Sequence, residues 1–207
     1  MLKREPRIQR AVQARLTLNP ARAAWLVVAL WVPYAALNTL FPGSPLTYTL
    51  ALLLAALALS LLLFSGESPR TLYLRLARPS RFGLLILLLM LAFIPGALLA
   101  GRGQAFSVLD DLAYAPASAL AQELYFRAAL LVALARLSTG RPQRAVLAQA
   151  ALFALWHVRA FLVVAPLLAL GALLLTFVAG LFWGAQVSRD RTVMWAAAEH
   201  TLFLIVQ

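Results

Sequence analysis

Residues 46–64 read LTYTLALLLAALALSLLLF, a run of nineteen residues without a charged side chain. A helix of about 20 mostly apolar residues crosses the roughly 30 Å of hydrocarbon in a bilayer. Pro45 stands just before the run, at a position where the start of a helix needs no backbone N–H. The stretch therefore predicts a membrane-spanning helix, and it decides the fold class.

The composition of the whole chain agrees with a membrane protein. Of its 207 residues, 63% are hydrophobic and 12% are charged, and the mean hydropathy is +0.87. A soluble domain is usually about 45–50% apolar and about 25% charged. The chain has no cysteine, which excludes disulfide frameworks, thiolate metal sites and cysteine nucleophiles.

Apolar runs alternate with clusters of charge, proline and glycine along the chain, which predicts an all-α, polytopic transmembrane helical bundle of about seven spans. The predicted spans cover residues 23–40, 46–64, 82–100, 112–137, 144–157, 162–187 and 192–207. The last span is the weakest, because it is short and ends at the last residue of the sequence. We divide the chain into a basic cytoplasmic tail (1–22), an N-terminal transmembrane scaffold (23–111) and a helical core (112–207).

Basic residues outnumber acidic ones by 18 to 7, which gives a formal net charge of +11. When the predicted loops alternate between the two sides of the membrane, fifteen basic residues share the side of the N-terminus and only Arg102 and Arg159 lie opposite. The positive-inside rule then places the N-terminus in the cytoplasm. Because topology explains the charge, we expect the lipid bilayer and no nucleic acid as a partner, in a multi-pass protein of a bacterial plasma (inner) membrane.

The loop between the second and third predicted spans, residues 65–81, alternates basic and apolar side chains. This pattern fits an interfacial amphipathic helix that touches anionic lipid. A plain basic connector explains it equally well.

Ionisable side chains inside a span cost roughly 2.5–3.5 kcal/mol each on insertion scales, so they carry a functional hypothesis by default. The first three predicted spans contain only Asn38 as a sizeable polar side chain. The chemistry is therefore expected in the helical core, whose polar residues include both histidines of the chain: Gln122, Glu123, Arg127, Gln149, His157, Glu199 and His200.

Helical spacing relates three of these residues on the fourth span. Glu123 and Arg127 are four residues apart with the acid first, the favoured order for an ion pair on one helix face. Gln122 is rotated by about 100° from Glu123, so it can face the protein interior. A purely structural role stays open for the ion pair and for either histidine, since polar side chains in membranes often serve only as interhelical hydrogen-bond partners. For Gln149 we favour such a packing role.

Three known intramembrane protease patterns do not fit. A His-Glu-x-x-His zinc motif, in either direction, fails because position 196 is Ala. A serine protease needs its nucleophile inside a span, whereas Gly43-Ser44 lies in a predicted outer loop. An aspartyl protease needs two aspartates on separate helices, whereas Asp110 and Asp111 are adjacent.

Three ordered motifs fit another pattern. The fourth span contains Gln122-Glu123-Leu-Tyr-Phe-Arg127, the fifth contains Phe153-Ala-Leu-Trp-His157, and the seventh contains His200 followed four residues later by Leu204. In order and spacing these resemble the motifs Glu-Glu-x-x-x-Arg, Phe-x-x-x-His and His-x-x-x-Asn/Asp of the CPBP (CAAX-processing and bacteriocin-processing, or ABI) family of membrane proteases. The resemblance covers residues 112–207, the helical core.

The resemblance implies a glutamate-type endopeptidase buried in a helical bundle. In that family the leading acid of the first motif and the histidine of the second activate a water, while the third motif stabilises the oxyanion. Carried over by position, His157 orients the water, His200 donates to the oxyanion, and Arg127 and Phe153 support the site. A carboxylate withdrawn from water is a stronger base, which suits this chemistry.

Two positions depart from the family pattern. The leading acid is Gln122, an amide that can orient a water but cannot take its proton. The last position of the third motif is Leu204, which makes no hydrogen bond. Either Glu123 or Glu199 then serves as the base, or the protein no longer cuts peptides.

The expected function is that of an intramembrane endopeptidase that cleaves membrane-embedded or lipid-modified peptides with water activated by glutamate and histidine. The alternative is a pseudoprotease that acts as a membrane binding, immunity or chaperone-like module. A small transporter fits less well, since the first three spans lack a polar lining.

We expect no cofactor, because the motifs place no metal-chelating pair on one helix. Zinc remains an alternative, since two histidines and one or two glutamates could bind it. Small residues recur every four positions in the sixth predicted span, at Ala172, Thr176, Gly180, Gly184 and Ser188. Such a stripe lets a neighbouring helix approach closely, and we expect it to pack within the chain. The sequence does not predict the oligomeric state.

Overall fold

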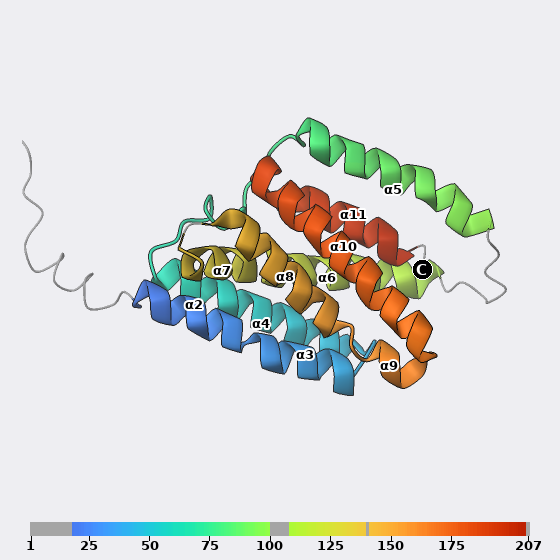
Figure 1. Ribbon diagram of the computed structural model, residues 1–207, viewed down its shortest axis with the longest axis horizontal. Helices are drawn as coiled ribbons and strands as arrows, with labels where there is room; N and C mark the ends of the chain where they lie inside the picture. The colour runs from blue at the N-terminus through green and yellow to red at the C-terminus, as the bar shows by residue number, and fades with distance from the viewer. Residues whose placement is uncertain (1–17, 100–107, 140, 206–207) are drawn as a thin grey trace, which may run out of the picture.

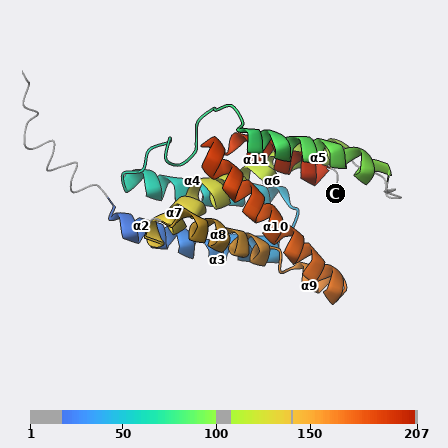
Figure 2. The ribbon, with the colours of Figure 1, turned by 45° about the horizontal axis from the view of Figure 1, so that its top comes forward.

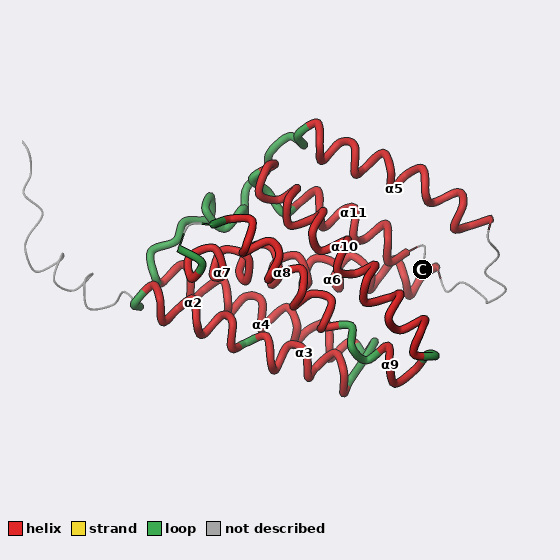
Figure 3. Tube along the Cα trace, viewed as in Figure 1, coloured by secondary structure: helices red, strands yellow, loops and turns green. Residues whose placement is uncertain are grey.

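The computed structural model describes residues 18–99, 108–139 and 141–205. Within these ranges every regular element is a helix and no strand occurs, as Figure 3 shows. The all-α prediction is therefore confirmed. The helices, labelled in Figure 1, are α2 (Pro20–Ala29), α3 (Trp31–Leu40), α4 (Pro45–Phe64), α5 (Arg81–Leu99), α6 (Val108–Glu123), η1 (Leu124–Leu130), α7 (Leu131–Leu137), α8 (Pro142–Trp156), α9 (Ala160–Val163), α10 (Pro166–Asp190) and α11 (Met194–Ile205).

Four of these helices begin at a proline, namely α2, α4, α8 and α10. Proline suits this position because the first N–H of a helix has no partner within the helix. Two of the starts are also capped by a side chain: Asn19 accepts hydrogen bonds from the N–H groups of Ala21 and Arg22, and Ser44 accepts one from Thr47. The local sequence thus fixes where these helices begin.

Five described segments are long and apolar enough to cross a membrane, by length and composition: Pro20–Leu40, Pro45–Phe64, Tyr114–Leu137, Pro142–Val163 and Pro166–Asp190. Each of the other two predicted spans also contains a helix, although Arg81–Ala92 of α5 is a shorter apolar segment and α11 has 12 residues. The protein is thus a helical membrane protein. The total of seven spans and the cytoplasmic side of the N-terminus stay predictions.

Two predicted spans differ from the structure in detail. The first is divided at Leu30 into α2 and α3, because Pro33 has no N–H to donate to the carbonyl of Ala29 one turn earlier. The sixth was expected to begin at residue 162, but α10 begins at Pro166. Ala165 precedes Pro166 and has ψ 144°, as expected because a residue that precedes proline avoids the helical region; Val164 before it is also extended.

The loop formed by residues 65–80, here called the strap, is not helical. Of the two alternatives for this loop, the interfacial helix is wrong, because Tyr73 has a left-handed backbone (φ 59°) and two prolines interrupt the segment. The strap instead binds the turn between α10 and α11 and the start of α11: the Tyr73 carbonyl accepts from the N–H of Val193, and the Ala77 carbonyl accepts from the indole of Trp195.

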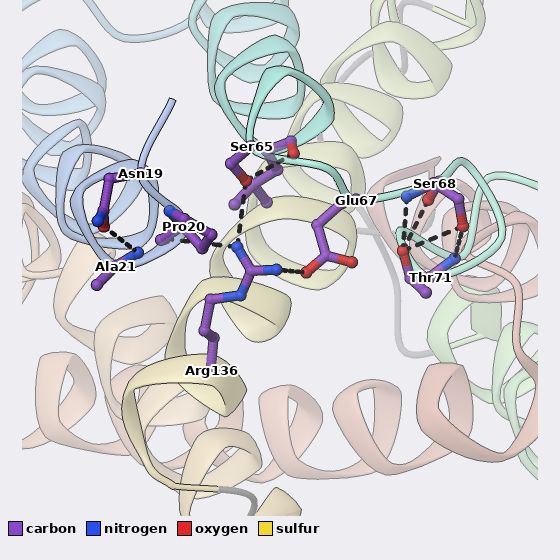
Figure 4. Close-up of polar contacts among 9 residues, drawn as sticks. Asn19, Pro20, Ala21, Ser65, Glu67, Ser68, Thr71 and Arg136 are labelled. Carbon is purple, nitrogen blue, oxygen red and sulfur yellow. Dashed lines mark hydrogen bonds and ion pairs between the residues drawn. The ribbon is translucent and has the colours of Figure 1, made fainter. Parts of the chain in front are cut away.

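Arg136 of α7 fastens the start of the strap to the bundle (Figure 4). Its guanidinium donates to the Ser65 hydroxyl over 3.1 Å, forms an ion pair with Glu67, and reaches the carbonyl of Pro20 at the start of α2. One side chain therefore links α2, α4 and α7 at one end of the bundle.

The helices pack as a bundle with α5 on one edge. α10 lies along α8, α11 lies along α6, and α4 packs against α6 and η1. Figures 1 and 2 both show α5 beside α11, on the side away from α2 and α3. Large apolar side chains such as Leu53, Leu88 and Leu167 remain exposed on α4, α5 and α10, as expected for helices that face lipid.

Candidate active site

The first motif lies where the fourth predicted span changes its winding. Between α6 and α7 the seven residues of η1 form a π-helix, with Glu123 as its N-cap residue and Arg127 inside it. Segments of π-helix are rare and frequently lie at functional sites. Ordinary α-helical spacing does not predict this element.

Glu123 connects the first motif to the third. Its Oε1 lies 3.1 Å from Nη1 of Arg127 and 2.8 Å from Nδ1 of His200 on α11. A carboxylate only accepts, so His200 Nδ1 donates this hydrogen bond. Glu123 and Arg127 are fully buried and His200 nearly so. The predicted ion pair is confirmed, and it is joined by a histidine from another helix.

Aromatic rings enclose this charged cluster. The Arg127 guanidinium lies 4.2 Å from the ring centroid of Phe153 and 5.4 Å from that of Trp183, distances at which a cation is attracted to a ring face. Trp183 also stacks on the His200 ring, with centroids 4.5 Å apart. Phe153 of the second motif therefore contacts Arg127 of the first motif, while its supporting role in catalysis stays a prediction.

His157 is the residue that follows α8, and its orientation is fixed by a backbone contact. Its Nδ1 lies 2.9 Å from the carbonyl oxygen of Phe153. A carbonyl only accepts, so Nδ1 carries the proton, and in the neutral ring Nε2 is then an acceptor. The side chain is half-buried and lines two cavities.

The first of these, here called the polar cavity, has a volume of about 220 Å³. Its walls include the three motif positions Gln122, His157 and Leu204. Gln122 donates from Nε2 to the Ser118 hydroxyl over 3.1 Å, while its Oε1 is buried and has no partner. The side chain at the leading motif position thus faces the same space as the histidine of the second motif.

The second, here called the apolar cavity, has a volume of about 470 Å³ and lies between α5, α8, α10 and α11. Apolar side chains such as Ile86, Met90 and Phe182 form most of its wall. His157 and Leu204 line both cavities, so the two spaces meet at these residues.

The remaining predicted residues lie elsewhere. Glu199 lines neither cavity and accepts a hydrogen bond of 2.8 Å from Gln186 of α10. Gln149 packs against the small-residue stripe, since a Cβ on Gly184 would lie 2.8 Å from its Oε1. A Cβ on Gly180 would lie 3.0 Å from the Cα of Ala150. The stripe therefore seats α10 on α8 within the chain, as predicted.

Sequence reasoning missed the part of the site that comes from the N-terminal half. Tyr34 and Asn38 of α3 and Thr47 of α4 line the polar cavity together with Gln122 and His157. Asn38 was visible as the one sizeable polar side chain in the first three predicted spans, and Tyr34 is one helical turn before it. The region named a scaffold thus also forms a wall of the site.

Within the described residues, no three or more His, Asp or Glu side chains lie close enough together to hold a metal ion. The acids and histidines of the motifs have other partners instead. Glu123 pairs with Arg127, His157 contacts a backbone carbonyl, and Glu199 accepts a hydrogen bond from Gln186.

The comparison with known families agrees with the motifs. Residues 104–206 match the family model described as type II CAAX prenyl endopeptidase Rce1-like. No curated protein and no solved structure matches the chain. The matched half contains all three motifs and every residue of the charged cluster. Through residues 104–206 the chain belongs to the Rce1-like family of CAAX prenyl endopeptidases, a family of membrane proteases.

Proposed function

We propose that this protein is an intramembrane peptidase in which His157 activates the hydrolytic water, in the polar cavity, with Gln122 as its partner. The observation that carries the proposal is that both side chains line one cavity, while the hydrogen bond to Phe153 leaves Nε2 of His157 as an acceptor. Membership of a protease family supports the reaction class.

His157 supplies the base that position 122 cannot. A water between the two side chains donates one hydrogen to Nε2 of His157 and the other to Oε1 of Gln122, which has no partner within the protein. The amide orients the water and the imidazole accepts the proton. A positioned general base contributes about 10²–10⁴-fold to a rate.

Glu123 has a structural role in this mechanism. It lines neither cavity, and one of its oxygens contacts both Arg127 and His200. It therefore holds the first and third motifs together and leaves water activation to His157. Glu199, which accepts a hydrogen bond from Gln186, likewise lines neither cavity.

The apolar lining of the second cavity is evidence for a substrate of low polarity. This cavity adjoins the polar cavity at His157 and Leu204, so an apolar segment bound there would hold the neighbouring peptide bond near the water. We therefore propose membrane-embedded or lipid-modified peptides as substrates, reached from within the plasma membrane.

One observation favours a second function. Gln122 and Leu204 replace two groups that the family pattern uses for chemistry, and both face the polar cavity. A protein that binds peptides in these cavities without cutting them would keep the same architecture.

Reconstitution in liposomes with a quenched fluorescent peptide library distinguishes the two functions. We expect the wild type to cleave and His157→Ala to lower the rate by about 10²–10⁴-fold. Arg141→Ala is the control, because Arg141 is exposed and lines neither cavity. If the wild type is inactive and Gln122→Glu creates cleavage, the binding function holds. Cleavage that survives His157→Ala would contradict the assignment of the base.

A further inference from the structure

Tyr34, a residue of the wall of the polar cavity, carries a second buried polar atom without a partner, its hydroxyl. Tyr34 is 1% exposed, and its hydroxyl forms no hydrogen bond. The other fully buried polar side-chain atom without a partner among the described residues of this cavity is Oε1 of Gln122. One atom is a donor and the other an acceptor, and both belong to side chains that share the cavity with His157.

The Tyr34 ring is held firmly by its neighbours. It stacks on Tyr125 of η1 with centroids 4.4 Å apart and planes 11° apart, and it meets Phe126 edge-on at 5.8 Å. Its backbone is fixed as well, since the indole of Trp156 donates to the Tyr34 carbonyl over 3.2 Å. The hydroxyl is therefore a preorganised donor, and the charged groups that act on it are Glu123 and Arg127.

Three other side-chain donors in the wall of this cavity already have acceptors. Asn38 donates to the carbonyl of Trp156 over 3.1 Å, Gln122 donates to Ser118, and Thr47 donates to the carbonyl of Phe41. Buried polar groups in native proteins almost always have a partner, so a persistent orphan at a cavity wall marks a place for a polar ligand atom. Leu204, in the same wall, offers no donor.

We propose that Tyr34 is a catalytic residue whose hydroxyl donates a hydrogen bond to the substrate carbonyl. This hydroxyl would fill the role of oxyanion donor, for which Leu204 has no suitable group. This inference rests on the proposed peptidase function. The water oxygen bonds to the carbonyl carbon while its proton passes to Nε2 of His157, and the carbonyl becomes an oxyanion held by the Tyr34 O–H. The carbon–nitrogen bond then breaks, and His157 returns the proton to the leaving amine.

The chain offers a matched pair of variants for the test. Tyr34→Phe removes one hydroxyl and keeps the ring that stacks on Tyr125. Tyr125→Phe removes an equally buried hydroxyl, one that donates to the Val27 carbonyl over 3.0 Å and does not line the cavity. We expect Tyr34→Phe to lower kcat by about 10²–10³-fold with KM unchanged, the usual effect of one lost oxyanion donor. Tyr125→Phe should leave kcat unchanged, and an equal loss in both variants, or no loss in Tyr34→Phe, would overturn the inference.

A binding measurement keeps the test independent of turnover. The best-bound library peptide is made with a phosphinate, which carries a tetrahedral anion, and with a reduced amide (CH₂–NH), which lacks the carbonyl oxygen. Thermophoresis should show that Tyr34→Phe weakens phosphinate binding by about 10²-fold and leaves reduced-amide binding unchanged. If the wild type never cleaves, the peptidase function is wrong. The comparison of phosphinate with reduced-amide binding still tests whether Tyr34 binds the anion. Phosphinate binding equal to that of the wild type would overturn the role of Tyr34.

Discussion

The indole of Trp183 stacks on the imidazole of His200, with centroids 4.5 Å apart and planes 23° apart. Trp183 belongs to α10 and His200 to α11, and the same indole lies 5.4 Å from the Arg127 guanidinium. A single side chain thus fixes the orientation of the third-motif histidine and closes one side of the charged cluster.

Removal of the indole should loosen this cluster. Trp183→Ala is expected to lower the free energy of unfolding by about 3–5 kcal/mol, because it opens a large hole beside a buried ion pair. Thermal unfolding in detergent measures the change. Trp25→Ala is the control, since Trp25 is 62% exposed, and a similar loss in both variants would contradict the proposed role of Trp183.

Loss of Arg127 alone should destabilise the protein more than loss of the whole Glu123–Arg127 ion pair. Arg127→Met leaves Glu123 buried without its cation and should lower the free energy of unfolding by about 3–5 kcal/mol. The double variant Glu123→Gln/Arg127→Met removes both charges and should recover part of that stability. Chemical unfolding of the single and double variants tests this, and a double variant less stable than Arg127→Met would contradict it.

Neutralisation of Glu199 should be tolerated. Glu199 accepts a hydrogen bond from Gln186, its other oxygen has no partner, and it forms no ion pair among the described residues. Glu199→Gln keeps an acceptor and removes a buried charge, so we expect unfolding temperature and cleavage rate to be retained. Should cleavage disappear while the protein stays folded, Glu199 would be the base and His157 would not.

Two glycines of α10 should respond in opposite ways to alanine. Gly180→Ala would push a methyl group against the backbone of Ala150 and should lower the free energy of unfolding by about 1–3 kcal/mol. Gly171→Ala meets no atom within 4 Å and should raise it by roughly 0.5–1 kcal/mol, because alanine favours a helix. Thermal unfolding of the two variants decides whether α8 and α10 touch as closely as described.

The predictable parts of this molecule are those set by local sequence. Apolar runs specify helices, prolines specify their starts, and the Glu123–Arg127 pair follows from a spacing of four residues. The π-helix that carries Arg127 could not be predicted, because no spacing distinguishes it from an α-helix. A connector at the strap was one of the two predicted alternatives, but its docking could not be predicted, because it depends on the left-handed Tyr73 and on a hydrogen bond to the distant Val193.

The composition of the site depended on tertiary packing. The spacing of residues along α11 does not predict which side chain of another helix contacts Glu199. The packing of α10 on α11 determines that this side chain is Gln186. In the same way Tyr34 is separated from Gln122 by most of the N-terminal half, so no motif connects them. The sequence shows that position 122 lacks the acid of the family pattern, but it does not show that Tyr34 lines the same cavity.

The strap also orders events during synthesis. A chain enters the membrane from its N-terminus, so α2, α3, α4 and the strap are in place before the ribosome has made α10 and α11. The Tyr73 and Ala77 carbonyls can accept from Val193 and from Trp195 of α11 only once these late residues have been made. The helices that carry the three motifs thus pack onto an N-terminal half that is already in the membrane. Residues 104–206 synthesised alone would lack the surface against which they pack.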